Sequence, residues 1–219
     1  MYISEKEIQI MSYKVLVING SPKESGCTAT ALNEVIHTLH EEGIETELLQ
    51  IGKENIRGCL ACGYCSTHDG CVVKDKVNEA ARLLEEADGL LVGSPVYYAS
   101  PNATLVAFLD RLFYSTGFSK QMKVGAAVVN CRRGGNTAAF DMLNKYFTIS
   151  GMPVVSSTYW NQTHGFTPED VKKDLEGLQT MRNLGRNMAF LIKAIAAEKE
   201  KAGRPLEEHD SFTSFPDGK

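Results

Sequence analysis

The chain has 219 residues, of which 43% are hydrophobic and 23% charged, a composition typical of one globular domain with an ordinary core. Its formal net charge of −4 offers no basic surface for a nucleic acid or an anionic membrane. No apolar run approaches the roughly 18–20 residues that a membrane-spanning helix needs. These totals leave a small molecule as the expected partner, without nucleic acid or membrane.

The two ends of the chain differ from its centre. Residues 1–12 carry Glu5 and Glu7 and contain no apolar leader, so they do not resemble a signal peptide and the expected location is cytoplasmic. Residues 203–219 combine Pro, Gly and charge with few apolar side chains. The predicted organisation is an N-terminal tail at 1–12, one domain at 13–202 and a C-terminal tail at 203–219.

Short apolar runs alternate with segments in which apolar residues recur at helical spacing. The predicted strands are residues 15–19, 46–51, 89–93, 124–130 and 154–159. The longest helical stripe runs from Val171 to Ile195, after a Thr-Pro-Glu-Asp start at Thr167. This alternation predicts a doubly wound α/β fold. Its five-stranded parallel sheet should have the order 2-1-3-4-5 and a ligand crevice at the carboxyl edge.

The loop after the first strand is rich in hydroxyl groups and small residues. Backbone N–H groups at a helix start, together with nearby hydroxyls, bind anions. We therefore predict a phosphate site in which Ser21 and Thr28 donate hydrogen bonds and Lys23 adds charge. The loop matches neither the ATP P-loop nor the dinucleotide fingerprint. The alternative is an ordinary turn between strand and helix.

Two further loops follow the third and fourth strands and should reach the same edge. Val96, Tyr97 and Tyr98 offer flat apolar surfaces for a flavin ring, and Gly134 and Gly135 allow close approach of the backbone. For the tyrosines the alternative is ordinary packing or a subunit contact. The pattern indicates a flavin mononucleotide (FMN) that extends across three loops.

Three motifs resemble those of the NADPH-dependent FMN reductases in the flavodoxin-like superfamily. Residues 20–28, 93–97 and 107–111 are similar to the family's G-S-P-R-x-x-G-N-T, G-S-P-V-Y and A-F-I-D-R segments. Lys23 replaces the usual Arg and loses its forked hydrogen bonding, and Cys27 replaces the usual Asn. The resemblance implies a flavodoxin-like fold, bound FMN and NAD(P)H as co-substrate. The predicted FMN-binding residues are Ser21, Lys23, Gly26, Cys27, Thr28, Pro95, Val96, Tyr97, Tyr98, Ser100, Cys131, Arg133, Gly134 and Gly135.

Four of the six cysteines form a C-x2-C-x2-C-x5-C run in the loop after the second strand. Runs of this density in ferredoxins bind [4Fe–4S] clusters, whereas structural zinc more often uses two C-x2-C pairs on either side of a longer loop. Within the same family the run resembles that of the iron–sulfur flavoproteins. The predicted cluster ligands are Cys59, Cys62, Cys65 and Cys71. Zinc and free redox-active thiols are the alternatives.

The favoured function is an FMN-dependent oxidoreductase that passes electrons from NAD(P)H to a small-molecule acceptor. The flavin carries the chemistry, so no catalytic side chain is predicted. The alternatives are an electron carrier reduced by ferredoxin and a thiol redox sensor.

Two expectations concern the assembly. We expect a homodimer or homotetramer, because a single sheet edge leaves the flavin open and the stripe from Val171 to Ile195 offers contact surface. We expect the cluster on the flavin's side of the molecule, because the cysteine run leaves the second strand at the same edge; the flavin nearest to it could then be that of a partner chain.

Overall fold

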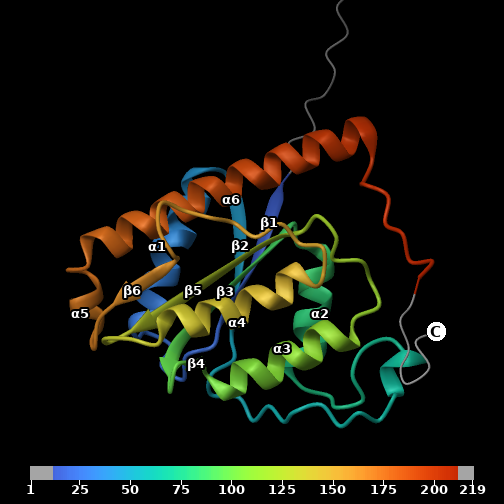
Figure 1. Cartoon of the computed structure of the whole chain (residues 1–219), viewed down its shortest axis with the longest axis horizontal. Helices are drawn as coiled ribbons and strands as arrows, with labels where there is room; N and C mark the ends of the chain where they lie inside the picture. The colour runs from blue at the N-terminus through green and yellow to red at the C-terminus, as the bar shows by residue number, and fades with distance from the viewer. Residues whose placement is uncertain (1–11, 212–219) are drawn as a thin grey trace, which may run out of the picture.

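The computed structural model describes residues 12–211, so all of the predicted tail at 1–12 except Ser12 lies outside the described residues, as do residues 212–219. A parallel sheet crosses the molecule with helices on both faces (Figure 1). The elements are β1 (Tyr13–Asn19), α1 (Cys27–Glu41), β2 (Ile44–Gln50), η1 (Tyr64–Ser66), α2 (Lys76–Glu86), β3 (Gly89–Tyr97), β4 (Ser100–Pro101), α3 (Ala103–Ser115), β5 (Val124–Cys131), α4 (Asn136–Thr148), β6 (Gln162–His164), α5 (Pro168–Val171) and α6 (Leu175–Ala202). Residues 203–211 follow α6 as an exposed segment without regular structure.

The sheet has the order β2-β1-β3-β5-β6, with all four pairings parallel, and β4 pairs antiparallel with the end of β3. Apart from the short β4 arm, this is the predicted flavodoxin order, and the cysteine run follows the second strand as expected. The continuous apolar runs explain the centre of the sheet. Both faces of β1 are covered, so its successive residues from Val15 to Ile18 are all fully buried.

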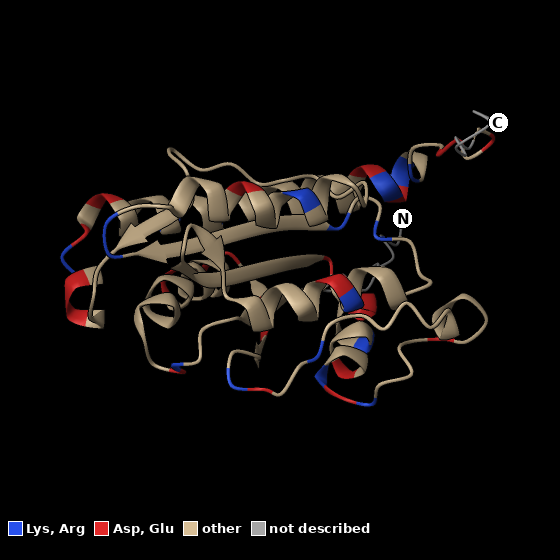
Figure 2. Cartoon of the chain, turned by 60° about the horizontal axis from the view of Figure 1, so that its bottom comes forward, with Lys and Arg blue, Asp and Glu red and all other residues tan. Residues whose placement is uncertain are grey.

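Helices α1 and α6 cover one face of the sheet, and α2, α3 and α4 cover the other. Figure 2 shows the sheet between its two helical layers. The stripe on α6 belongs to the first of these layers: Met181, Leu184 and Met188 are fully buried against β1 and α1. This stripe is therefore core, and it cannot serve as the predicted subunit surface. The large apolar side chains that α6 leaves exposed are those of Leu175 and Phe190. Within residues 12–211, no helix has both the length and the apolar character required to cross a bilayer.

The prediction of a fifth strand at 154–159 is wrong. Val154 makes a single bridge to Gly125, and the paired strand comes later, at β6. Local hydrogen bonding accounts for the difference, because Ser157 Oγ lies 2.7 Å from both Tyr159 O and Asn161 Oδ1 and can donate its one proton to either. Such bonds between a side chain and the nearby chain compete with a sheet ladder.

The last predicted helix is divided into α5 and α6. Thr167 and Asp170 form the expected capping box at the start of α5. Asp174 then accepts a hydrogen bond from Gly177 N at 3.0 Å and caps a second helix. This second cap explains why the apolar stripe, which predicted one helix, is divided between two helices.

We expect Gly125→Ala to destabilise the fold. A Cβ at this position of β5 would lie 2.6 Å from Phe147 Cγ, and this buried ring cannot move without disturbing α4. The free energy of unfolding should fall by about 1–3 kcal/mol, as in other overpacked cores. In urea unfolding, the matched control Gly117→Ala should change it by less than about 0.5 kcal/mol, because nothing lies within 4 Å of a Cβ there. Equal effects of the two variants would contradict this packing argument.

Candidate functional site

The three predicted FMN loops meet at the carboxyl edge of the sheet. Gly20 N donates to Gly93 O at 2.8 Å, and Asn102 Nδ2 donates to Gly20 O at 2.7 Å, which joins the first loop to the second. A Cβ at Gly135 would lie 2.9 Å from Ala99 Cα, so the third loop packs directly on the second. Sequence positions 20, 93 and 135 therefore belong to one site.

The predicted residues differ in how far they reach solvent. Ser21, Gly26, Thr28 and Cys131 are buried, Cys27, Pro95, Val96 and Gly135 are half-buried, and Lys23, Tyr97, Tyr98, Ser100, Arg133 and Gly134 are exposed. The exposed members are the ones that a bound molecule could cover.

Two helices at this edge begin without a side-chain cap. Among the six α-helices of the described chain, only α1 and α4 lack a side-chain hydrogen bond at the N-cap, and both have Gly there. The caps of the other four helices are Asp75, Asn102, Thr167 and Asp174. The first turns of α1 and α4 also contain no acidic residue. Their N–H groups and positive dipole ends fit an anion or a polar ring edge.

Hydrogen bonds shape the loop before α1. Ser21 N donates to Asn19 Oδ1 at 3.0 Å, and Lys23 N donates to Ser21 Oγ at 3.1 Å. Ser21 Oγ thus accepts from the loop and keeps its own proton for an external acceptor. Asn19 Nδ2 is buried and has no hydrogen-bond partner among the described residues. This set of donors fits the phosphate of FMN.

The second loop is a strained hairpin between β3 and β4. Its two tip residues, Tyr98 and Ala99, have φ of 50° and 59°, values that are unusual for residues other than glycine. Strain of this kind is concentrated at functional sites. The Tyr98 side chain is fully exposed, and Tyr97 is 46% exposed. Both rings are therefore exposed at this edge of the sheet, where a flat ligand could pack against them.

Polar residues of β6 and α6 extend the third loop. Asn136 Nδ2 donates to Gln162 Oε1 and lies 3.4 Å from His164 Nε2. The other ring nitrogen of His164, Nδ1, lies 3.6 Å from Asp174 Oδ2. The sequence contains no paired-histidine signal, so this group was not predicted.

The cysteine run lies away from that edge. It leaves β2 and runs alongside α3 to the end of this helix that lies away from the FMN loops, where η1 is found (Figure 1). All four cysteines line one cavity, together with Arg111, Tyr114 and Ser115 in the second half of α3. The expectation that the cluster shares the flavin's side of its own chain is therefore wrong. The end of a strand fixes where the following loop begins, but it does not fix the direction in which that loop then runs.

The four cysteines differ in their exposure and in the hydrogen bonds that hold their main chain. Cys59 and Cys62 are exposed, whereas Cys65 and Cys71 are half-buried. The main chain of Cys71 is held by Asn78 of α2, which accepts from its N at 2.8 Å and donates to its O at 3.0 Å. One end of the run is thus fixed to the body of the protein.

Arg111 joins both ends of the cysteine run to α3. Its side chain is 1% exposed, and its guanidinium donates to Arg57 O at 3.3 Å, Val73 O at 3.2 Å and the Asp75 carboxylate at 2.6 and 3.0 Å. Nε and Nη2 also donate to Cys71 Sγ at 3.4 and 3.3 Å. Burial alone would lower the pKa of Arg111, but the hydrogen bonds to Asp75 and Cys71 outweigh it and raise that pKa. The guanidinium is a permanent cation in the wall of the cavity.

The donor set of the cysteine cavity is compatible with an iron–sulfur cluster, because four thiols line it. In the described part of the chain, no three Cys, His, Asp or Glu side chains converge as the ligands of one ion do. A tetrahedral zinc ion takes its ligands at one point, whereas a cubane takes one thiolate at each of its four irons and so accepts thiols that are further apart. Ser115 Oγ, whose residue lines the cavity, is buried and has no hydrogen-bond partner among residues 12–211. An unpaired hydroxyl donor beside thiolates fits a sulfur-rich group.

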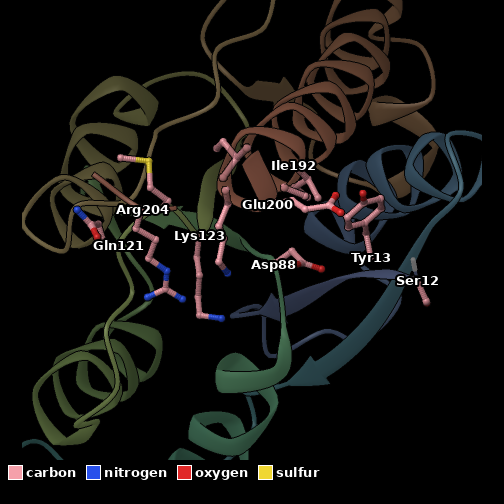
Figure 3. Close-up of a pocket in the computed structure, with 12 residues that line it drawn as sticks. Ser12, Tyr13, Asp88, Gln121, Lys123, Ile192, Glu200 and Arg204 are labelled. Carbon is pink, nitrogen blue, oxygen red and sulfur yellow. The ribbon is translucent and has the colours of Figure 1, made fainter. Parts of the chain in front are cut away.

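A separate cavity of about 340 Å³ lies at the amino edge of the sheet. Figure 3 shows its lining, which includes Asp88, Lys123, Ile192 and Arg204. The Lys123 ammonium donates to the carbonyl groups at the end of α2. None of the predicted FMN residues or cysteines lines this cavity, so it is separate from both sites.

Fold and site together define a flavin-binding protein of the flavodoxin-like class, and comparison with known proteins narrows the class. The model of the NADPH-dependent FMN reductase family matches residues 13–167, and the chain belongs to this family. Two iron–sulfur flavoproteins are similar along nearly their whole length. That of Methanocaldococcus jannaschii is 35% identical over 83% of this chain and 98% of its own, and that of Methanosarcina thermophila is 30% identical over 86% and 100%.

Solved structures agree on the fold. RosB with bound 8-demethyl-8-formylriboflavin-5′-phosphate superposes with a TM-score of 0.66, at 15% identity over 94% of both chains. The NAD(P)H:quinone oxidoreductase of Methanothermobacter marburgensis gives 0.63, at 18% identity over 81% of this chain and 96% of that one. The fold is thus shared with these structures, and membership of the family identifies the chain as an FMN-binding oxidoreductase.

We expect Thr28→Val to weaken FMN binding by about 1–3 kcal/mol, the cost of one lost hydrogen bond to a charged group. Thr28 is buried in the uncapped first turn of α1, where its hydroxyl can reach the phosphate. Thr30→Val is the matched control, because the Thr30 hydroxyl already donates to Gly26 O at 3.2 Å. Fluorescence titration of the FMN-free protein measures both affinities. Equal affinities in the parent and Thr28→Val would make the loop a simple turn.

We also expect two of the six thiols to react slowly with an alkylating reagent. Burial raises the pKa of the Cys27 and Cys131 thiols, so at neutral pH they stay protonated and only the thiolate reacts. Peptide mapping of FMN-free protein across a pH series should place the midpoint of their reaction at higher pH than in urea-unfolded protein. Midpoints at or below those of the unfolded chain would contradict this assignment.

Proposed function

We propose that the protein is an FMN-dependent oxidoreductase that joins FMN at the carboxyl edge to a [4Fe–4S] cluster held by the cysteine run. NAD(P)H is the proposed electron source and a small molecule the acceptor. The observation that carries the proposal is the pairing of two built sites in one chain: the uncapped starts of α1 and α4, and a cavity lined by four thiols. The names of the full-length relatives support the second site.

The residues of the carboxyl edge would bind and orient FMN. Ser21, Thr28 and the first N–H groups of α1 would hold the phosphate, with Lys23 adding charge from solvent. Tyr97 and Tyr98 would cover the ring, and the start of α4 would donate to its polar edge. When bound, FMN supplies the hydride and single-electron chemistry. The protein positions the ring and excludes water from it.

The distance within one chain favours an oligomer. Helix α3 has 13 residues and is therefore about 20 Å long at 1.5 Å per residue. It begins beside the FMN loops, and its second half lines the cysteine cavity. We propose that the chain forms a homo-oligomer in which the cysteine run of one copy faces the FMN of another. Static light scattering at micromolar concentration tests this, and a monomer would contradict it.

The second candidate is an electron carrier that a ferredoxin reduces through the cluster. The exposure of the site favours it: Cys59 and Cys62 reach solvent beside Leu60 and Val72, which are 46% and 40% exposed. A small protein partner could contact such a surface directly. Both candidates require FMN and the cluster, and they differ in the electron donor.

One experiment separates the candidates. The protein is purified without oxygen, and its FMN, iron and sulfide are counted per chain. It is then mixed with NADPH, NADH or reduced ferredoxin while the flavin absorbance is followed. Fast bleaching by a nicotinamide supports the reductase, whereas bleaching by ferredoxin alone supports the carrier. A protein without flavin would contradict both.

Removal of one thiol tests the role of the cluster. In Cys65→Ala we expect FMN to remain bound and reducible by the nicotinamide, and electron transfer to one-electron acceptors to slow at least tenfold. Thr67→Ala is the matched control, because this exposed residue lies in the same run and is not a thiol. If Cys65→Ala transfers electrons as fast as the parent, the cysteines do not relay electrons. Loss of both FMN and fold would make the cluster structural.

A further inference from the structure

Arg111 and Ser115 lie one turn apart on the same face of α3, and both line the cysteine cavity. Both are almost fully buried, with 1% and 4% of their surface exposed. The tyrosine between them, Tyr114, is 71% exposed and lies at the rim. The buried side of the cavity is thus formed by one residue with a cationic side chain and one with a hydroxyl group.

The two groups differ in what they already bind. Arg111 donates twice to Cys71 Sγ while its remaining hydrogen bonds tie it to the chain on both sides of the run. This fixed geometry prevents the cation from turning away when the charge of the cavity changes. Ser115 Oγ has no partner in the described part of the chain, so its proton is free for a sulfur atom. Hydrogen-bond donors and positive charge at the sulfur atoms set the potentials of iron–sulfur clusters.

We propose that Arg111 and Ser115 raise the reduction potential of the cluster, a role that rests on the proposed binding of a [4Fe–4S] cluster by the four cysteines. Reduction transfers one electron from a donor, such as reduced ferredoxin or dithionite, to a site that already carries the negative charge of four thiolates. No proton or bond is exchanged. A buried cation and a hydroxyl donor stabilise the added charge more than they stabilise the oxidised site.

The charge of Asp75 allows a test that depends on the direction in which the midpoint potential of the cluster shifts. Asp75 binds Arg111 and also caps α2 by accepting from Val77 N at 3.1 Å. Asp75→Asn keeps a good helix cap and removes a negative charge near the cavity. Arg111→Met removes the positive charge at similar length. Both variants break the ion pair between Arg111 and Asp75. If this pair only held the structure together, both variants would shift the midpoint potential of the cluster in the same direction.

The experiment is an EPR-monitored dithionite titration of each anaerobically purified protein, with iron, sulfide and FMN counted per chain. We expect the cluster midpoint to shift to lower potential in Arg111→Met and to higher potential in Asp75→Asn. Shifts in the same direction, or none in either variant, would overturn the role of Arg111. If Arg111→Met does not retain the cluster, Asp75→Asn decides by itself, since an unchanged or lower midpoint contradicts the proposal.

Ser115→Ala tests the hydroxyl separately. This variant removes a buried hydroxyl without a partner, so the FMN-free and metal-free chain should unfold at the same or a higher temperature. The cluster midpoint should shift to lower potential, and the FMN midpoint should stay constant. An unchanged cluster midpoint would remove Ser115 from the proposal. Parent protein that contains FMN but no iron would instead refute the proposed cluster, a result distinct from a failure of either residue.

Discussion

The layout of the molecule depends on the burial of its central strands on both faces. From Val15 to Ile18 every side chain of β1 is covered, by α1 and α6 on one face and by α2 and α3 on the other. Such a sheet has no free face for polar chemistry, which is therefore confined to its edges and to the outer helices. The flavin loops occupy the carboxyl edge, and the cysteine run uses the outside of α3. The two proposed redox sites can coexist in this small fold because neither interrupts the core.

The sequence was informative wherever a local pattern had one physical meaning. Continuous apolar runs correctly predicted β1, β3 and β5, and with them the order of the sheet. The three loops at the carboxyl edge followed from that order, and the structure brings them together. The pattern failed at residues 154–159, where Ser157 and Asn161 supply hydrogen bonds that compete with the ladder. Apolar periodicity does not register such side-chain bonds.

Contacts between residues that are far apart in the chain could not be predicted from the sequence. The path of the cysteine run is set by Arg111 and Asn78, which lie 40 and seven residues from Cys71 and hold it through hydrogen bonds. Arg111 was visible as part of a motif, but the motif does not say which residues its guanidinium reaches. Gln50, which donates to Ser21 O, and Gly52, where a Cβ would lie 2.1 Å from Ser21 C, also shape the phosphate loop. Nothing around them in the sequence pointed to that role.

The double use of Asp75 couples parts of the chain that belong to different elements. One carboxylate oxygen accepts both from Val77 N and from Arg111 Nη2, and the other accepts from Arg111 Nη1. The first turn of α2 therefore cannot fray without loosening the guanidinium, and through it the segment from Cys71 to Val73. In a hydrogen-exchange experiment, we therefore expect these amides to open together with α3 as one cooperative unit. The exchange rate of the first turn of α2 should consequently change when the structure around the cysteine cavity changes, although none of the four cysteines lies in this turn.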